Sequence, residues 1–336
     1  MSKKSVQTIE DIARLANVSK STVSRALNNS PLIKQETIDR IQAIASEHNF
    51  RINAPARNLS TRQSRTIAFI THAYNESFSV DDLFGLEIMG GITKGLYTLG
   101  YDFMVVHVDP KDTGWAHQYL DSGRVDGFIL MTSRRKQLHV KALVEMNAPF
   151  IVWGFPLAKY NCCSVSGDDL TGGKLATEHL IHIGRQRIAF LGGPTEEVEA
   201  QLRFKGYKTA LEAAGRSVNP DMLAYGDYTH ASGITAMKRL LEQFPDLDAV
   251  FVNSDLMAIG AISVIQNSGK QVPNDIAVVG YDDLSLANYN NLPLTTVRQN
   301  IPLAGKLLAQ NLIQYLKTGV VTNVTVPVEL VVRKSA

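Results

Sequence analysis

The stretch TIEDIARLANVSKSTVSRAL, from Thr8 to Leu27, holds two short helical patterns separated by a break at Asn17. Thr8 starts the first helix, because its hydroxyl can cap the free amides and Asp11 stands three residues later, in a box-like arrangement. Ser19 is placed to cap the second helix in the same way. The stretch therefore predicts two short helices joined by a tight turn.

A third helical pattern, at about 35–48, carries apolar residues that can pack on the first two helices. Three helices in this order are typical of a helix-turn-helix module. A module that binds another protein is the alternative. The second helix favours DNA, because hydroxyls and cations of the kind it exposes reach base edges and phosphates in the major groove. These side chains are Lys20, Ser21, Thr22, Ser24 and Arg25.

The charge of the chain is unevenly distributed. Residues 1–65 carry 11 Lys and Arg against 5 Asp and Glu, whereas the remainder carries 23 against 27. A basic N-terminal part on a mildly acidic body favours a polyanionic partner for that part alone. A solubilising tail is the alternative, and the helical patterning of this part argues against it.

The N-terminal motifs resemble the signature of the LacI/GalR family of transcription regulators: TIEDIA at 8–13, VS at 18–19 and TVSRALN at 22–28. The resemblance implies that Lys20, Ser21 and Arg25 read bases, and that Thr22 and Ser24 contact the DNA backbone. It also implies a homodimer on a near-palindromic operator, with the helices near 84–99 and 113–122 at the dimer face. The remaining DNA contacts expected in this region are Thr8, Ser19 and Asn28.

The segment NAPARNL at 53–59 resembles the hinge helix of the same family. In that comparison Asn53 and Ala56 contact DNA, and Leu59 enters the minor groove, where an apolar wedge unstacks a base step and bends the duplex. A helix this short is unstable alone. We therefore expect it to fold on DNA, when a dimer holds two copies together. An ordinary linker role for Leu59 is the alternative.

Short apolar runs alternate with helical patterns from Thr66 onward, which indicates parallel sheets covered by helices on both faces. The alternation restarts near 161–164, and a second crossover is expected near 290–298. The fold class is therefore α/β, with an all-α head and a two-lobed, doubly wound body. The expected divisions are a DNA-binding domain at 1–50, a hinge and linker at 51–64, and an effector-binding and dimerisation domain at 65–336, with lobe one at about 65–161 and 291–322 and lobe two at about 162–290 and 323–336.

The body resembles the periplasmic binding protein type I fold in motifs that span most of its length. These are EHL at 178–180, GGP at 192–194, RFKGY at 203–207, DLMAIG at 255–260, VGYDD at 279–283 and LTTVRQ at 294–299. Ligands of doubly wound sheets bind beyond the carboxyl ends of the strands, which places one cleft between the lobes.

Arg203 and Asp282 are the strongest candidates for ligand contacts, as a fork of donors and a carboxylate for hydroxyl groups. Aromatic rings combined with such polar groups suit a sugar, and they also suit a nucleobase or nucleoside. The stretch WGFP at 153–156 carries no charge, which favours a neutral ligand. The further candidates are Phe84, Phe155, Tyr228, Ser254, Asp255 and Gln299, although the phenylalanines also suit a core and Asp255 a helix cap.

Other classes of protein are disfavoured. The chain has no run of about 18 apolar residues, and its N-terminus is polar, so we expect a cytoplasmic protein rather than a membrane or exported solute-binding protein. The eight histidines are scattered and no metal or cofactor motif occurs, so neither an enzyme nor a cofactor is expected. Cys162 and Cys163 are adjacent, which strains a disulfide, and both suit buried positions.

Overall fold

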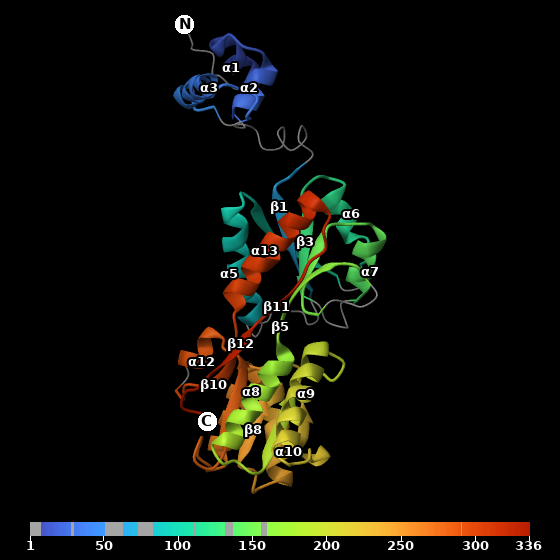
Figure 1. The fold of residues 1–336 in the computed structure, drawn as a ribbon, viewed down its shortest axis with the longest axis vertical. Coiled ribbons are helices and arrows are strands. Elements are labelled where there is room, and N and C mark those ends of the chain that lie inside the picture. The colour runs from blue at the N-terminus through green and yellow to red at the C-terminus, as the bar shows by residue number, and fades with distance from the viewer. Residues whose placement is uncertain are drawn as a thin grey trace. The chain divides into compact units, whose positions relative to one another are not determined.

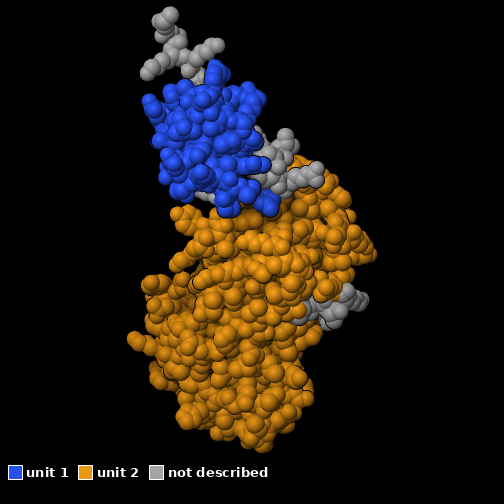
Figure 2. Space-filling view, turned by 45° about the horizontal axis from the view of Figure 1, so that its top comes forward, with its two compact units in different colours: residues 1–64 blue, residues 65–336 orange. Residues whose placement is uncertain are grey.

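The computed structural model describes residues 8–27, 30–50, 63–72, 83–109, 112–131, 137–155, 160–289 and 291–336. The chain divides into two compact units, residues 1–64 and 65–336, which are distinguished by colour in Figure 2. Each unit has its own apolar core and is described by itself.

The first unit contains three helices, α1 (Ile9–Ala16), α2 (Lys20–Leu27) and α3 (Gln35–Glu47). The capping box at the start of α1 is confirmed, since the hydroxyl of Thr8 accepts from the amide of Asp11 at 3.2 Å and the Asp11 carboxylate accepts from the amide of Thr8. The hydroxyl of Ser19 accepts from the amide of Thr22 at 3.1 Å. Side-chain caps therefore mark the starts of both helices, α1 and α2.

The core of this unit draws on all three helices. Ile12, Val23 and Ile41 are completely buried, one from each helix. Burying an aliphatic side chain of this size contributes about 1.5–3 kcal/mol. Such residues hold the three helices together from the inner side of α2, while Lys20, Ser21 and Arg25 on its outer side remain exposed.

The second unit begins with a six-stranded sheet in the order β11-β5-β4-β3-β1-β2, in which all neighbours are parallel. Helices α5 (Leu83–Thr98) and α13 (Ile301–Thr318) cover one face, and α6 (Trp115–Leu120) and α7 (Gln137–Glu145) cover the other (Figure 1). The inner strands are buried on both sides, which explains their unbroken apolar runs. The strands are β1 (Thr66–His72), β2 (Asp102–Val108), β3 (Gly127–Met131), β4 (Phe150–Trp153), β5 (Cys163–Gly167) and β11 (Asn323–Val326).

The second sheet has the order β12-β10-β9-β8-β6-β7, and its last strand, β12, is antiparallel to β10. Helices α8 (Asp169–His182) and α9 (Val198–Ala213) cover one face. Helices α10 (His230–Gln243) and α11 (Asp255–Asn267) cover the other, and the short α12 (Ser285–Tyr289) follows β9. The strands are β6 (Ile188–Gly192), β7 (Leu223–Tyr225), β8 (Ala249–Val252), β9 (Ala277–Asp282), β10 (Thr295–Gln299) and β12 (Val328–Val331).

The expected lobe boundaries are wrong in detail. The chain passes between the sheets three times, after Gly167, after Gln299 and at Pro327, each a little later than the expected crossovers near 161–164 and 290–298 and the expected lobe limit at about 322. Strands β5 and β11 therefore belong to lobe one and β10 to lobe two. Proline has no amide hydrogen for a sheet, and Pro327 separates β11 from β12.

Strands β5 and β10 are polar in sequence yet mostly buried in the structure. Ser164 on β5 donates to the amide oxygen of Asn323 at 2.8 Å, and Thr296 on β10 donates to the carboxylate of Asp255 at 2.6 Å. Buried polar groups are tolerated when hydrogen-bonded, so hydropathy alone does not mark such strands.

Two further observations concern burial and length. Cys162 and Cys163 are both buried, as predicted, and both are free thiols. Within the described ranges, no helix has the length and apolar character needed to cross a bilayer.

Candidate functional site

The outer side of α2 carries the predicted DNA contacts. Thr8, Ser19, Lys20, Ser21 and Arg25 are exposed, whereas Thr22 and Ser24 are half-buried. The ammonium group of Lys20 pairs with Glu10 on α1. An exposed pair of this kind contributes no more than about 1 kcal/mol, so a DNA phosphate can replace it. The predicted contacts Asn28, Asn53, Ala56 and Leu59 lie outside the described residues, as does the expected hinge helix.

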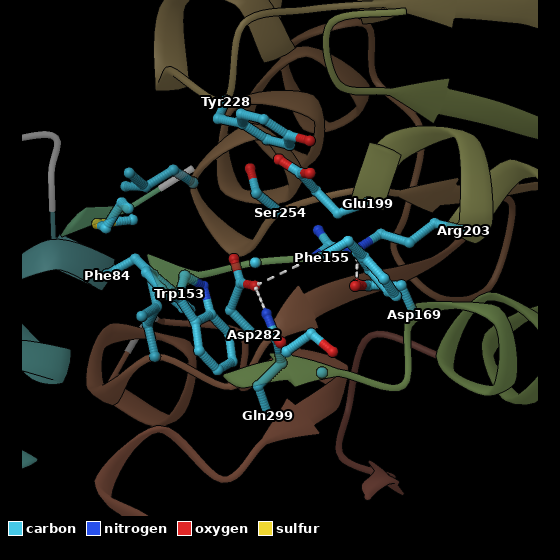
Figure 3. A pocket seen from close by; sticks show the side chains of 16 residues that line it. Phe84, Trp153, Phe155, Asp169, Glu199, Arg203, Tyr228, Ser254, Asp282 and Gln299 are labelled. Atoms are coloured by element: carbon cyan, nitrogen blue, oxygen red, sulfur yellow. Dashed lines mark hydrogen bonds and ion pairs between the residues drawn. The ribbon is translucent and has the colours of Figure 1, made fainter. Parts of the chain in front are cut away.

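The second unit contains a cavity of about 190 Å³ between its two sheets (Figure 3). Its walls come from the carboxyl ends of strands in both lobes, including β3, β4 and β5 of one sheet and β9 and β10 of the other, in agreement with the rule for doubly wound folds. The lining residues are Phe84, Met131, Trp153, Gly154, Phe155, Ser166, Gly167, Asp169, Glu199, Arg203, Tyr228, Ser254, Leu256, Asp282, Leu284 and Gln299.

Aromatic rings from both lobes face this cavity. The rings of Phe84 and Trp153 lie with centroids 5.7 Å apart in lobe one, and Phe155 also lines the cavity. Tyr228 comes from lobe two and lies across the cavity in Figure 3. Ring faces of this kind pack on flat apolar surfaces such as one side of a sugar ring.

Arg203 on α9 is held in place by the protein itself. Its Nε donates to Asp169 at 2.7 Å and its Nη1 donates to the backbone oxygen of Asn253 at 2.6 Å. The guanidinium also lies 3.7 Å from the ring centroid of Tyr281. The side chain is 5% exposed. These contacts fix the guanidinium before any ligand arrives and leave Nη2 as its least engaged nitrogen.

Asp282 lies at the end of β9 beside this guanidinium. Its Oδ1 accepts from Nε2 of Gln299 at 2.8 Å and is 4.0 Å from Nη2 of Arg203. Burial raises the pKa of Asp282 to about 7, and the charge of Arg203 opposes that rise.

Two residues of the pocket have left-handed backbone conformations that favour glycine. The φ angles of Tyr228 and Asp282 are +70° and +110°. Non-glycine residues held in such conformations cluster at binding sites, where the surrounding fold fixes the side chain in place. The carboxylate of Asp282 and the phenol of Tyr228 are therefore presented to the cavity at a cost in backbone energy.

Seven of the eight predicted ligand contacts line the cavity, and Asp255 does not. The Asp255 carboxylate is completely buried, where it accepts from the amide of Leu284 at 2.8 Å and from the hydroxyl of Thr296. Its role is therefore to tie α11 to neighbouring segments. Its neighbour Ser254 both caps α11 and lines the cavity.

Several lining residues were not predicted, among them Asp169, Glu199 and Trp153. Glu199 stands four residues before Arg203 on α9, a spacing that places both on one helix face and could have identified it. Burial raises the pKa of Glu199 to about 7. Asp169 follows β5, and it was missed because that strand was not recognised.

Comparisons with known proteins agree with this architecture. Residues 8–53 match the family model of bacterial regulatory proteins, lacI family, and residues 177–336 match that of a periplasmic binding protein-like domain. The HTH-type transcriptional regulator CelR of Thermobifida fusca is 35% identical over 330 residues, which cover 96% of this chain and 95% of that protein.

Solved structures are similar over nearly the whole chain. A transcriptional regulator CelR–cellobiose complex is 32% identical with a TM-score of 0.75, covering 98% of this chain and 99% of that one. A Lac repressor dimer bound to operator and the anti-inducer ONPF is 29% identical with a TM-score of 0.80, covering 98% of both chains. The helix-turn-helix head, the two-lobed body and this identity along the chain show that it belongs to the LacI family of bacterial regulatory proteins.

Proposed function

We propose that this protein is a transcriptional repressor that binds a near-palindromic operator as a homodimer and is controlled by a small sugar. The observation that carries the proposal is the cavity of the second unit, which combines aromatic walls with fixed polar groups. A chain with both a DNA-reading head and such a cavity is suited to couple two binding events. A role as a regulator, without catalysis and in the cytoplasm, is part of this proposal.

A sugar suits the cavity because its ring has apolar faces and a rim of hydroxyl groups. The apolar faces can pack against Trp153 and Tyr228. The carboxylate of Asp282 can accept a hydrogen bond from a sugar hydroxyl, and the guanidinium of Arg203 can donate one to a hydroxyl oxygen. The CelR structure that resembles this chain is a complex with cellobiose. A nucleobase or nucleoside, which also stacks on aromatic rings, is the competing class of ligand.

On the DNA side, we assign base reading to Lys20, Ser21 and Arg25, with Thr22 and Ser24 on the phosphates. The Lac repressor structure that resembles this chain is a dimer on operator DNA. We further propose that residues 51–64 form a hinge in which Leu59 enters the minor groove. The ligand would act by changing how the two lobe-one faces of a dimer meet, and the coupling equals its difference in affinity for the two states.

Electrophoretic mobility shift with promoter DNA from upstream of the gene tests the DNA half of this proposal. We expect a complex that survives excess competitor DNA and weakens steeply with salt, because phosphate contacts release counterions. Failure to select any promoter fragment over competitor would refute the proposed operator binding.

A thermal shift screen of sugars and nucleobases tests the other half. A ligand that binds the folded state alone raises the melting temperature by mass action. Cellobiose and related sugars should produce the shift, and they should change operator affinity in the same assay. If nucleobases raise the melting temperature and no sugar does, the ligand is a nucleobase or nucleoside rather than a sugar.

A further inference from the structure

The cavity contains more negative than positive groups. Of the described residues that line it, three are carboxylates, Asp169, Glu199 and Asp282, and one is a cation, Arg203. Arg203 is already shared between two of these carboxylates, 2.7 Å from Asp169 and 4.0 Å from Asp282. The positive charge is therefore largely neutralised within the wall, and Glu199 remains as the carboxylate without a close cation.

Glu199 also has few hydrogen-bond partners. Its own backbone amide donates to the carboxylate, and the described side chains supply no further hydrogen bond to it. The hydroxyl of Tyr228 is buried and likewise has no partner among the described residues. In Figure 3 the two groups point toward the same end of the cavity. The charge of Glu199 acts on Tyr228, so an acceptor with one hydrogen bond and a hydroxyl without a partner lie near each other at this end of the cavity.

The neighbours of Glu199 reinforce its need for a donor. Glu197, at the N-cap of α9, and Asp169 on α8 add negative charge, and Arg203, one turn later on α9, is the positive group that acts on Glu199. A buried polar group costs free energy unless it is hydrogen-bonded, and a charged one costs more. A ligand that donates a hydrogen bond here would remove that cost.

We propose that Glu199, with the Tyr228 hydroxyl beside it, is a specificity-determining residue that accepts a hydrogen bond from a hydroxyl or amino group of the sugar and rejects sugars carrying a carboxylate there. The proposal rests on the function proposed above and defines the ligand class more narrowly. Above pH 7, where Glu199 is ionised, a hydrogen bond to its carboxylate is roughly twice as strong as a neutral one, so binding is measured at pH 8. A second carboxylate at this end would meet the negative charge of Glu199, and like charges repel strongly in a partly dry cavity.

The experiment compares three probes of matched size: cellobiose, its 6′-carboxylate cellobiuronic acid, and the diamine formed by two β-1,4-linked glucosamines. Binding to the full chain is followed by tryptophan fluorescence, because Trp153 lines the cavity and the other tryptophan, Trp115 at the start of α6, is buried in the core of lobe one. The variants are Glu199→Gln, which removes the charge, and Glu199→Asp, which retains it. Glu212→Gln is the matched control, since Glu212 is on the same helix and pairs with Lys208 at the surface.

The original chain should bind cellobiose and the diamine at least about tenfold more tightly than cellobiuronic acid, a difference of about 1.4 kcal/mol. Glu199→Gln should lose most of this preference, whereas Glu199→Asp and Glu212→Gln should retain it. The Glu199→Asp result keeps the test decisive if the Gln variant folds poorly, because loss of preference in a chain that retains the charge contradicts the proposal.

The outcomes separate this inference from the function on which it rests. Binding of cellobiose with equal affinity for cellobiuronic acid, or a preference unchanged in Glu199→Gln, overturns the role of Glu199 alone. Absence of binding by all three probes overturns the proposed sugar class and the role of Glu199 with it.

Discussion

Arg203 combines two duties that a single substitution cannot separate. Its side chain lines the ligand cavity. It also neutralises the buried Asp169 and donates a hydrogen bond to the backbone oxygen of Asn253, the residue that follows β8. Burial raises the pKa of Asp169, and Arg203 opposes that rise. The residue is therefore part of the fold of lobe two as well as of the site.

Arg203→Ala should accordingly abolish the ligand response and also destabilise the second unit. Breaking a buried ion pair by removing one partner costs about 3–5 kcal/mol, because it leaves an uncompensated charge. Urea unfolding and ligand titration measure the two effects. A variant with normal stability but no ligand response would mean that the Asp169 pair contributes little to the fold.

Glu199 should make stability depend on pH. Burial raises its pKa to about 7 in the folded chain, whereas an unfolded glutamate titrates near 4.3. Between these values the folded state holds a proton that the unfolded state has released. The free energy of unfolding therefore falls as pH rises from about 4.5 to about 7, and it levels off above that.

Glu199→Gln should remove this contribution. The variant should match the original chain near pH 4.5 and exceed it in stability at pH 7.5, by about 1–3 kcal/mol. Urea midpoints at the two pH values provide the measurement, with Glu212→Gln as the exposed control. A difference between variant and original chain that is the same at both pH values would contradict the assignment of the raised pKa.

Among the secondary-structure elements, α5 and α13 pack so closely that glycine is needed at the contact. A β-carbon on Gly91 would lie 2.9 Å from the backbone oxygen of Pro302, whereas one on the adjacent Gly90 would meet nothing within 4 Å. Both glycines lie in the same helix, so they differ in packing and not in propensity.

Gly91→Ala should therefore destabilise lobe one by about 1–3 kcal/mol through overpacking. Gly90→Ala should stabilise it by about 0.5–1 kcal/mol, because alanine loses less entropy in a helix. Thermal melts of the two variants give the comparison. If the two substitutions had equal effects, α5 and α13 could move apart at little cost to accommodate a β-carbon at Gly91.

Helix α2 is expected to carry sequence discrimination through its exposed side. Arg25→Ala should lose about 1–3 kcal/mol of preference for operator over a base-substituted site, as is usual for an arginine that binds guanine. Arg40→Ala on α3, also an exposed arginine, should retain that preference. Mobility shifts with the two DNA duplexes test this. A uniform loss on both duplexes in Arg25→Ala would assign Arg25 to phosphate contact.

For the whole molecule, the proposed coupling between cavity and operator must be reciprocal. If cellobiose changes operator affinity by a given factor, operator DNA changes cellobiose affinity by the same factor. Fluorescence titration of cellobiose with and without saturating operator measures one factor, and mobility shift with and without cellobiose measures the other. Unequal factors would indicate that a further component takes part in the equilibrium.

Local patterns in the chain were enough to predict the three head helices, the Thr8 cap and most strands and helices of the body. These elements follow from residues that are close in sequence, such as caps and apolar periodicity. A position at the end of a strand likewise identified Asp282 as a residue of the cavity.

The strands and site residues that the sequence did not predict depend on contacts between segments far apart in the chain. Strands β5 and β10 escaped prediction because their buried polar side chains are satisfied by partners far along the chain, such as Asn323 for Ser164. The folded arrangement also assigns β11 and β12 to different sheets. It buries the Asp255 carboxylate against Thr296, and it brings Glu199 to the same end of the cavity as Tyr228. Hydropathy reports the polarity of a residue, whereas its burial and its partners exist only once distant segments have come together.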